Sequence, residues 1–288
     1  MSPPDPRPLR IALAQIQPGE DPDANLATVL ARMTEAAGAG ARVIAFPELS
    51  LTPFLPRVRA TEPPRHLAQP IPGPATEAIG RRAGELGLVT VSNLYEVDDA
   101  GRCFDASPVF DADGSLLGVT RMTHITHYPG FWEQDYYHPA DRLAPVYETT
   151  VGRIGVAICY DRHFPEYMRA LGLAGAQLVV IPQAGVVGEW PPGVFEGEVQ
   201  VAAFQNGYFA ALCNRVGPED NLTFAGESFV ANPEGRVIFR APTGEPGLFL
   251  ADCDLAQCES CTARQLFWKD RRPDLYATWL GLGGPSAG

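Results

Sequence analysis

The chain has 288 residues, of which 45% are hydrophobic, a composition typical of a globular protein with one large domain or two small ones. Its formal net charge of −12 and pI near 4.9 argue against nucleic acid and anionic membranes as partners, because both attract basic surfaces. No apolar run reaches the length of a membrane span and residues 1–8 hold no hydrophobic signal core, so we expect a cytoplasmic protein.

The first third of the chain alternates predicted strands and helices. Leu9–Gln15 alternates like a strand, and Asp21 can cap a helix that reaches Gly38. A strand at 43–46, a helix at 75–86 and a strand at 88–93 follow. This β-α-β-α-β order favours parallel strands joined by crossover helices.

A hairpin and a long aromatic loop occupy the middle of the chain. Strands at 106–110 and 115–120 flank Asp111-Ala-Asp-Gly114, a hairpin signal. Residues 121–147 are rich in His, Tyr, Phe, Trp and Pro and lack regular periodicity. A long loop of this kind inside a compact domain is more often functional than idle.

The remaining elements continue to the C-terminus without a linker, so we expect one domain over residues 1–288. It would carry a disordered lead at 1–8 and a C-terminal tail at about 265–288 that packs on the fold or on a second subunit. The predicted elements are strands at 154–158, 178–181, 209–214, 227–231 and 236–239, a last strand reaching 255, and helices at 166–174 and 196–206.

Cys159 is a candidate nucleophile. The apolar strand at 154–158 runs directly into it, and Pro165 then opens a helix. A strand fixes the cysteine backbone, and N–H groups of the following turn favour a thiolate and an oxyanion on its substrate. The alternative is a small buried hydrophobic residue, since free cysteines are often buried.

Glu48 and Glu133 are candidate acid–base groups. Glu48 follows the strand at 43–46, and Glu133 lies in the aromatic loop. The carboxyl ends of parallel strands open on one side of a sheet, where a carboxylate near a thiol can take its proton and later give it to a leaving amine. Alone, Glu48 could instead stabilise a turn and Glu133 could be a solvated loop charge.

Together these segments resemble the nitrilase superfamily of carbon–nitrogen hydrolases over nearly the whole chain. Several separate motifs occur in the same order as in that family. They are Val43-Ile-Ala-Phe-Pro-Glu48, Asp111 to Gly118, Gly130 to Asp141, Gly155 to Glu166, and Asn214-Arg-Val-Gly217 leading into Ser228 to Gly235.

The resemblance implies a four-layer α-β-β-α sandwich that associates into a homodimer or larger homo-oligomer. It also implies that Glu48 is the general base, Cys159 the nucleophile and Glu133 a further site carboxylate. The backbone N–H of Tyr160 would be one oxyanion donor. The implied partner is a small amide or carbamoyl substrate, with no metal and no cofactor.

The chain departs from this family at its catalytic lysine. The family's Arg-Lys-x-His segment reads Arg121-Met-Thr-His124 here, and the chain's one lysine is Lys269. Loss of an oxyanion donor costs on the order of 100- to 1,000-fold in rate, and without the ammonium at least one site carboxyl should have a raised pKa. Asp105 also stands where the family often has asparagine.

Two side chains beside Met122 offer partial substitutes for the lysine. Arg121 would point to the opposite face if the strand continues, whereas His124 would share the face of Met122 and could donate a hydrogen bond. The alternative for His124 is a loop residue that holds local structure, which we favour.

Neither the histidines nor the clustered cysteines predict a metal centre. His124, His127 and His138 are suitable ligand types, but their spacing is not diagnostic. Cys253, Cys258 and Cys261 overlap one iron–sulfur spacing, but no fourth clustered ligand follows them.

The leading hypothesis is hydrolysis of a non-peptide carbon–nitrogen bond, in an amide or N-carbamoyl compound, through a thioester on Cys159. A catalytically impaired relative that binds a small ligand or partner is a second hypothesis, supported by Met122. Transfer of the acyl group to an amine is a third. The substrate itself is not predicted.

Overall fold

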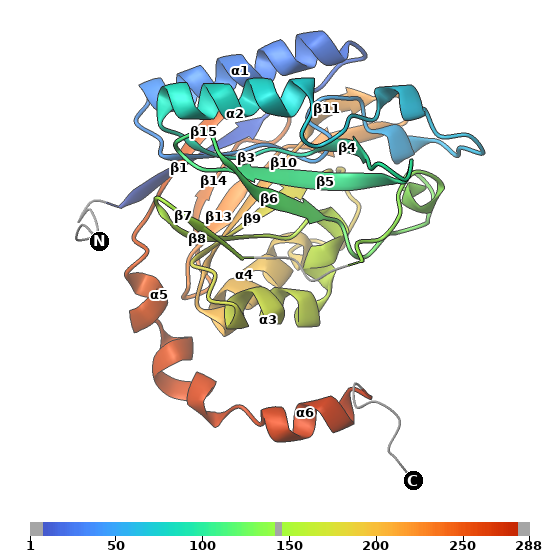
Figure 1. Ribbon diagram of the computed structural model, residues 1–288. Coiled ribbons are helices and arrows are strands. Elements are labelled where there is room, and N and C mark those ends of the chain that lie inside the picture. The colour runs from blue at the N-terminus through green and yellow to red at the C-terminus, as the bar shows by residue number, and fades with distance from the viewer. Residues whose placement is uncertain (1–7, 142–145, 282–288) are drawn as a thin grey trace.

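A computed structural model describes residues 8–141 and 146–281. Two β-sheets lie face to face, and a pair of helices covers the outer face of each, which gives four layers in the order α-β-β-α (Figure 1). The predicted four-layer sandwich is confirmed. Within the described residues no helix is long and apolar enough to cross a membrane.

The first sheet carries the N-terminal half of the chain, with strand order β15-β1-β2-β3-β5-β4 and β6 paired to β5. As the alternating pattern predicted, β1, β2 and β3 are parallel. The strands are β1 (Leu9–Gln15), β2 (Val43–Ala45), β3 (Val89–Val91), β4 (Leu94–Val97), β5 (Cys103–Phe110), β6 (Leu116–Arg121) and β15 (Gly247–Cys253).

The second sheet has the order β14-β13-β10-β9-β8-β7, with β8, β9 and β10 parallel. The strands β11 and β12 form a separate antiparallel hairpin. The strands are β7 (Val146–Thr149), β8 (Gly152–Val156), β9 (Leu178–Gln183), β10 (Phe209–Asn214), β11 (Val216–Glu219), β12 (Leu222–Ala225), β13 (Phe229–Ala231) and β14 (Val237–Arg240).

The helices begin and end where local chemistry requires. The Asp21 side chain accepts hydrogen bonds from the first turn of α1, and Gly87 (φ 62°) ends α2 in the left-handed conformation that glycine adopts at least cost. The helices of the four layers are α1 (Pro22–Gly38) and α2 (Pro74–Leu86) on the first sheet, and α3 (Pro165–Leu173) and α4 (Val194–Asn206) on the second.

The main core lies between the two sheets. Leu13 and Val43 of the first sheet and Val156 and Val180 of the second belong to one fully buried cluster, which also contains Cys159. Each such aliphatic side chain contributes roughly 1.5–3 kcal/mol on burial. The candidate nucleophile therefore belongs to the buried core between the two sheets.

Three strand regions differ from the sequence expectation. The sequence pattern predicts no element for β4, β7 or the hairpin β11–β12, and Tyr147 of β7 falls within the expected aromatic loop. These segments are only four residues long, too short for a reliable period-two pattern.

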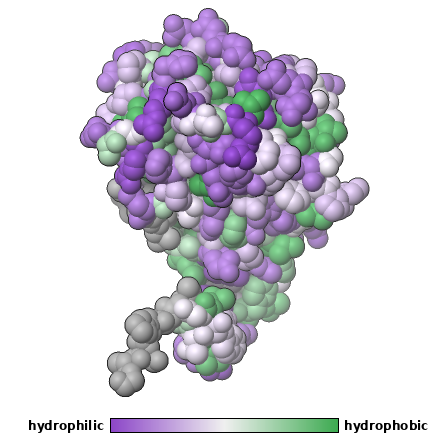
Figure 2. Space-filling model, turned by 90° about the vertical axis from the view of Figure 1, so that its right-hand side faces the viewer, coloured by the Kyte–Doolittle hydropathy of each residue, from purple (hydrophilic) through white to green (hydrophobic). Residues whose placement is uncertain are grey.

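The C-terminal tail reaches away from the four layers (Figures 1 and 2). It contains α5 (Gln257–Ser260), the turns η5 (Ala263–Phe267) and η6 (Trp268–Asp270), and α6 (Pro273–Trp279). Near its start, the Trp268 indole N–H donates to the carbonyl of Gln205. At its end, Trp279 is 68% exposed and Leu280 is 54% exposed. Most of the expected lead at 1–8, and the last part of the expected tail, lie outside the described residues.

Candidate active site

Cys159 stands at the point where β8 passes into the short helix η4 (Cys159–His163). Its φ of 42° lies in the left-handed region, which non-glycine residues rarely occupy and which occurs most often at functional sites. The thiol is 5% exposed, and the Gln183 side-chain amide at the end of β9 donates to its sulfur at 3.1 Å. The backbone thus presents this side chain in a fixed, strained position.

Glu48 and Glu133 converge on this sulfur. Glu48 follows β2, and Glu133 opens the short helix η3 (Glu133–Asp135) of the aromatic loop. Among the described residues, Glu48, Glu133 and Cys159 form a group whose donor atoms all lie within 4.8 Å of one another. Both carboxyls are fully buried, and three of their four oxygens have no hydrogen-bond partner.

Burial raises the pKa of all three groups. For Glu48 the charges of Asp105 and Glu133 add to the effect of burial, and for Cys159 the charges of Glu48 and Glu133 do so. For Glu133, burial acts together with the charge of Asp105. Burial and the charges of the two glutamates therefore favour the thiol of Cys159 over the thiolate.

Asp105 is a fourth acidic group of the site, on β5. Burial raises its pKa to about 7, against a hydrogen bond from Asn93 that lowers it. The Asn93 amide holds the site together, since its nitrogen donates to Asp105 Oδ1 at 2.5 Å and its oxygen accepts the N–H of Leu49 at 2.6 Å. Asn93 therefore fixes Asp105 relative to the backbone beside Glu48.

Met122 lies just after β6 and is fully buried in the same cluster as Cys159. Arg121 points to the other face of the sheet, as expected, where it pairs with Glu96 and lies over the Phe104 ring at 3.8 Å. Among the residues that the structure describes, no basic side chain pairs with the carboxyl of Glu48, Asp105 or Glu133. Met122 therefore brings no charge to the acidic cluster, and no described basic side chain pairs with it.

His124 does not enter the acidic cluster. Its Nδ1 lies 2.7 Å from Asp161 Oδ1, and its ring stacks on Phe164 with centroids 3.5 Å apart. Asp161 also accepts the backbone N–H groups of Thr123 and His124. These contacts agree with the structural role for His124, which ties the segment after Met122 to the turn that carries Cys159. Tyr160 is the second residue of that turn, directly after the nucleophile.

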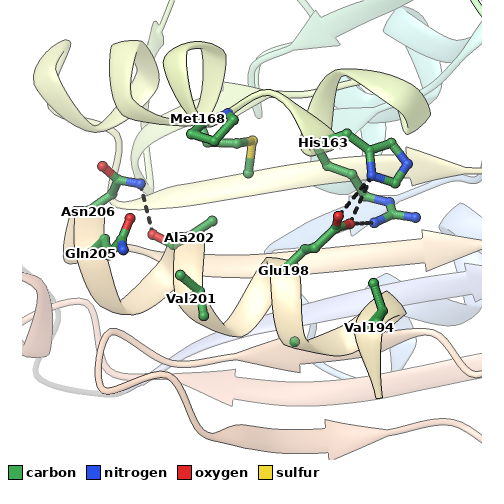
Figure 3. A pocket seen from close by; sticks show the side chains of 11 residues that line it. His163, Met168, Val194, Glu198, Val201, Ala202, Gln205 and Asn206 are labelled. Carbon is green, nitrogen blue, oxygen red and sulfur yellow. Dashed lines mark hydrogen bonds and ion pairs between the residues drawn. The ribbon is translucent and has the colours of Figure 1, made fainter. Parts of the chain in front are cut away.

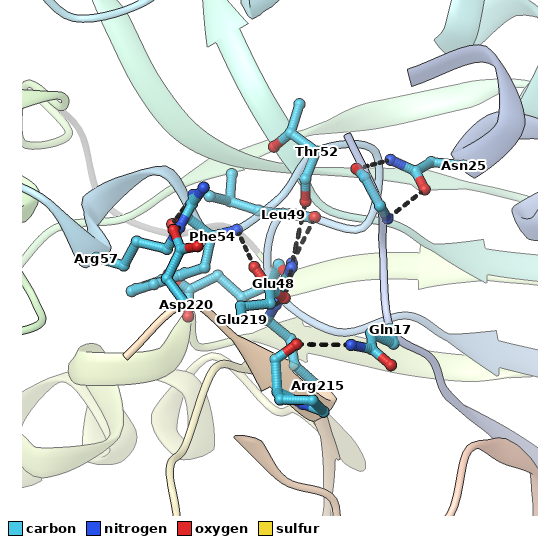
Figure 4. Close-up of polar contacts among 12 residues, drawn as sticks. Gln17, Asn25, Glu48, Leu49, Thr52, Phe54, Arg57, Arg215, Glu219 and Asp220 are labelled. Atoms are coloured by element: carbon cyan, nitrogen blue, oxygen red, sulfur yellow. Dashed lines mark hydrogen bonds and ion pairs between the residues drawn. The ribbon is translucent and has the colours of Figure 1, made fainter. Parts of the chain in front are cut away.

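Arg215 supports the backbone of Glu48, and the sequence reasoning missed it. Its Nη1 donates to the carbonyls of Glu48 and Leu49 at 2.8 and 2.7 Å, and it pairs with the buried Glu219 (Figure 4). Like Asn93 and Gln183, it lies at or just beyond the end of a strand. Polar residues at such strand ends were the signal that could have found all three.

The described histidines do not assemble into a metal site. His127 Nδ1 lies 3.3 Å from Gln134 Oε1, and His138 packs on the Phe104 ring. The six cysteines are free and buried. Among the described residues, the cluster of Glu48, Glu133 and Cys159 has the donor spacing for a small cation.

A cavity of about 400 Å³ lies elsewhere, between α3 and α4 (Figure 3). Glu198 in its wall pairs with Arg162 and with His163. None of Glu48, Glu133 and Cys159 lines it. This cavity is therefore separate from the acidic cluster.

Comparison with known proteins agrees with this architecture. The profile of the family described as Carbon-nitrogen hydrolase matches residues 10–263. The chain is 32% identical over 290 residues to an N-carbamoylputrescine amidase of Solanum lycopersicum, with 95% of each chain covered. The chain belongs to the carbon–nitrogen hydrolase family.

The fold is also similar to those of solved structures from the same family. An amidase from Nesterenkonia sp. AN1, a member of the nitrilase superfamily, superposes with a TM-score of 0.80 at 26% identity, covering 96% of this chain and 98% of that one. One of its variants shows the acetamide moiety of fluoroacetamide covalently added at the active site cysteine. A carbon-nitrogen hydrolase from Helicobacter pylori, at 24% identity and a TM-score of 0.86 over 94% of this chain and 98% of its own, shares the fold. The predicted amidase-type branch of the nitrilase superfamily is confirmed.

Proposed function

We propose that this protein hydrolyses a small amide or N-carbamoyl compound through a thioester on Cys159. The observation that carries the proposal is the buried approach of Glu48, Glu133 and the Cys159 sulfur within 4.8 Å. A carboxyl and a thiol this close need only a small shift, or one bridging water, to come within reach for proton transfer.

The chemistry follows from these positions. Glu48 takes the proton of the Cys159 thiol as the sulfur attacks the carbonyl carbon, and the Tyr160 backbone N–H faces the oxyanion. The carbon–nitrogen bond then breaks and the leaving amine takes the proton from Glu48. Water, deprotonated by Glu48, hydrolyses the thioester and restores the thiol.

An amine-bearing or neutral substrate suits the charge of the surroundings. Glu189 lines a cavity of about 260 Å³ and accepts a hydrogen bond from the Tyr128 hydroxyl at 2.8 Å. Tyr128 in turn lies close enough for the charges of Cys159 and Glu133 to raise its pKa, after burial and Glu189. With Glu48, Asp105 and Glu133 also acidic, an anionic substrate would be repelled.

Acylation of the cysteine tests the proposal. The protein is incubated with a panel of amides and N-carbamoyl amines, quenched in acid and analysed by peptide mass spectrometry. We expect a mass increase on the Cys159 peptide and release of amine or ammonia. If no member of the panel acylates Cys159, and iodoacetamide modifies it no faster than an ordinary thiol, the hydrolase proposal is wrong.

Replacement of Met122 by lysine tests the departure from the family. An ammonium at this position would neutralise the acidic cluster and donate to the oxyanion, so Met122→Lys should raise the turnover of simple amides by about 10- to 100-fold. Met122→Leu is the matched control, with similar volume and no donor. Equal or lower turnover in Met122→Lys would mean that the site is rebuilt around the methionine.

A binding protein without catalysis is the second candidate, and the absence of a basic partner for the three buried carboxyls among the described residues favours it. In that case a ligand would bind with the wild-type affinity after Cys159→Ala, and no acylated peptide would form. Equilibrium binding of an amide to both proteins, measured by calorimetry, separates the two candidates.

We also propose that the chain is one domain and forms a homodimer through its C-terminal tail. Trp279 and Leu280 at the end of the tail are more than half exposed, which is unusual for apolar side chains of a monomer. Light scattering on the purified protein should give the mass of two 31.0 kDa chains. A deletion after residue 270 should give the mass of one chain.

A further inference from the structure

The buried side-chain amide of Gln183 connects the Cys159 sulfur to Arg162. Gln183 ends β9, and its Nε2 donates to the sulfur at 3.1 Å. Its Oε1 accepts a hydrogen bond from Nε of Arg162 at 3.0 Å. Gln183 is 2% exposed and Arg162 is 3% exposed, so bulk water does not compete for either hydrogen bond. The candidate nucleophile therefore lies at the end of a short, buried chain of hydrogen bonds.

Arg162 determines which end of the Gln183 amide faces the sulfur. The two ends of a side-chain amide have nearly the same shape, but the oxygen accepts hydrogen bonds and the nitrogen donates them. An arginine side chain donates and cannot accept. A reversed amide would place its NH2 group against Nε of Arg162, so that two buried donors would face one another without an acceptor. The Arg162 contact thus keeps an N–H of Gln183 directed at Cys159.

The guanidinium of Arg162 is itself held from two sides. Its Nη1 pairs with Glu198 of α4, and its Cζ lies over the Phe195 ring, 4.7 Å from the centroid. The Glu198 carboxylate also lies 3.0 Å from Nδ1 of His163 (Figure 3). Arg162 belongs to the same short helix η4 as Cys159. These contacts hold the guanidinium, and through it the Gln183 amide, in place relative to the sulfur.

We propose that Gln183 is a catalytic residue that stabilises the Cys159 thiolate by a hydrogen bond, and that Arg162 is a positioning residue that keeps this donor directed at the sulfur. The inference rests on the proposed role of Cys159 as the nucleophile. Met122 has no donor to offer at the position of the family's lysine. The Gln183 amide supplies a neutral donor to the charge that the reaction creates.

The hydrogen bond contributes most while the sulfur is charged. A hydrogen bond to an ionised acceptor is roughly twice as strong as one to a neutral acceptor, so the amide favours the thiolate over the thiol. Negative charge develops on the sulfur as its proton passes to Glu48, and it leaves the sulfur when the carbon–sulfur bond forms. The charge returns when the thioester is hydrolysed and the thiolate departs, until Glu48 gives the proton back. Gln183 loses no proton in either step.

Alkylation of Cys159 by iodoacetamide tests the role of Gln183 without any substrate. The thiolate is the reactive form, and peptide mass spectrometry distinguishes Cys159 from the other cysteines. Gln183→Met has a side chain of similar length without the donor. We expect it to slow alkylation at neutral pH by about three- to tenfold, because the thiolate fraction falls by more than its nucleophilicity rises. An unchanged rate would overturn the proposal.

Two further variants separate hydrogen bonding from packing. Gln183→Glu keeps the shape and the contact with Arg162 but turns an oxygen toward the sulfur, so it should slow alkylation at least as much as Gln183→Met. A wild-type rate in Gln183→Glu would show that only the shape of the side chain matters, and the proposal would be wrong. Gln177→Met is the matched control, because Gln177 lies at the other end of β9 and accepts the N–H of Arg153. Should Gln183→Met not fold, Gln183→Glu provides the test.

Two replacements of Arg162 test its positioning role. Arg162→Met and Arg162→Gln both lose the ion pair with Glu198, but the amide nitrogen of a glutamine is as many bonds from Cα as Nε of an arginine. Only Arg162→Gln therefore keeps a donor for Gln183. We expect Arg162→Met to be alkylated as slowly as Gln183→Met, and Arg162→Gln to remain within about twofold of the wild type.

A double variant completes the comparison. If Arg162 acts through Gln183, Arg162→Met combined with Gln183→Met should be alkylated no more slowly than either single variant. Equal rates in the two Arg162 variants, or additive losses in the double variant, would refute the positioning role. Should Arg162→Met not fold, a rate in Arg162→Gln as low as that of Gln183→Met would refute it.

These outcomes are distinguishable from failure of the proposed function. If alkylation slows as expected but no amide acylates Cys159, Gln183 stabilises the thiolate and the hydrolase proposal fails. If amides acylate Cys159 and Gln183→Met leaves both acylation and alkylation unchanged, the hydrolase proposal stands and the role of Gln183 fails.

Discussion

Glu48 belongs to two buried environments of opposite character. Its main-chain carbonyl faces the Arg215 guanidinium, which also pairs with the buried Glu219. Its side chain faces Asp105, Glu133 and Cys159, with no basic partner among the described residues. The Arg215 region balances its charges and stabilises the fold, whereas the acidic cluster leaves them unbalanced. The buried, unbalanced charges that destabilise the fold thus lie at the site where the chemistry is proposed to occur.

Removal of the thiol should have the largest effect. Cys159→Ala deletes the atom that attacks the substrate, so amide turnover should fall by at least about 10,000-fold. The measurement is steady-state release of amine or ammonia at saturating substrate. Cys258→Ala removes another buried thiol, one that is not part of the group of Glu48, Glu133 and Cys159. This variant is the control and should retain turnover. Comparable turnover in Cys159→Ala would exclude the thioester route.

Neutralisation of Glu48 should reduce activity while it increases stability. Glu48→Gln removes the base, so turnover should fall by roughly 100- to 10,000-fold. Because the folded pKa of Glu48 is raised, its ionisation destabilises the folded state above the ordinary pKa of a glutamate, and the variant no longer bears that cost. Urea unfolding at neutral pH should therefore show a higher midpoint than the wild type. A lower midpoint would contradict the description of the cluster as unbalanced.

Removal of the Arg215 guanidinium should lower the stability of the fold, whereas neutralisation of Glu48 should raise it. Arg215→Met leaves Glu219 buried without its basic partner and removes the guanidinium that donates to the carbonyls of Glu48 and Thr52, so the free energy of unfolding should fall by about 3–5 kcal/mol. Arg32→Met, which breaks an exposed pair with Glu35, should cost less than about 1 kcal/mol. Urea titrations of both variants give the comparison. Similar costs for the two would show that burial of the Arg215 pair does not matter.

The smallest predicted effect is a dependence of stability on pH. The folded pKa of Asp105, about 7, lies above its ordinary value of 3.8. The folded state therefore binds a proton more tightly than the unfolded chain, and this contribution to stability is lost as pH rises between these two values. Asp105→Asn should show a flatter decline of unfolding free energy over that window. Parallel curves for the two proteins would show that Asp105 does not cause the dependence of stability on pH.

The sequence predicted most of the fold because its main elements are long and periodic. The strands β1 and β10 and the helices α1 and α2 have boundaries within a residue or two of those expected. The short strands β4 and β7 were missed, since their pairing depends on neighbours from distant parts of the chain. Tertiary contacts, rather than local pattern, decide such segments.

The site was partly predictable, because two of its residues directly follow well-defined strands. Strand ends marked Glu48 and Cys159, and the aromatic loop marked Glu133, and the structure brings all three together. Asn93, Gln183 and Arg215 were not identified, because polar residues follow many strands and only the fold shows which strand ends meet at the site. The charge of Asp105 on β5 helps to raise the pKa of Glu48 beyond β2, and no local pattern could have shown that these two acidic groups belong to one site.

One exposed residue of the C-terminal tail has a practical consequence. The chain's one lysine, Lys269, is exposed just before α6. Apart from the α-amino group, an amine-reactive dye therefore has a single target, placed between Trp268, which is held by Gln205, and the exposed apolar residues Trp279 and Leu280. A fluorophore at this position would report directly on what the tail touches in solution, without any engineered residue.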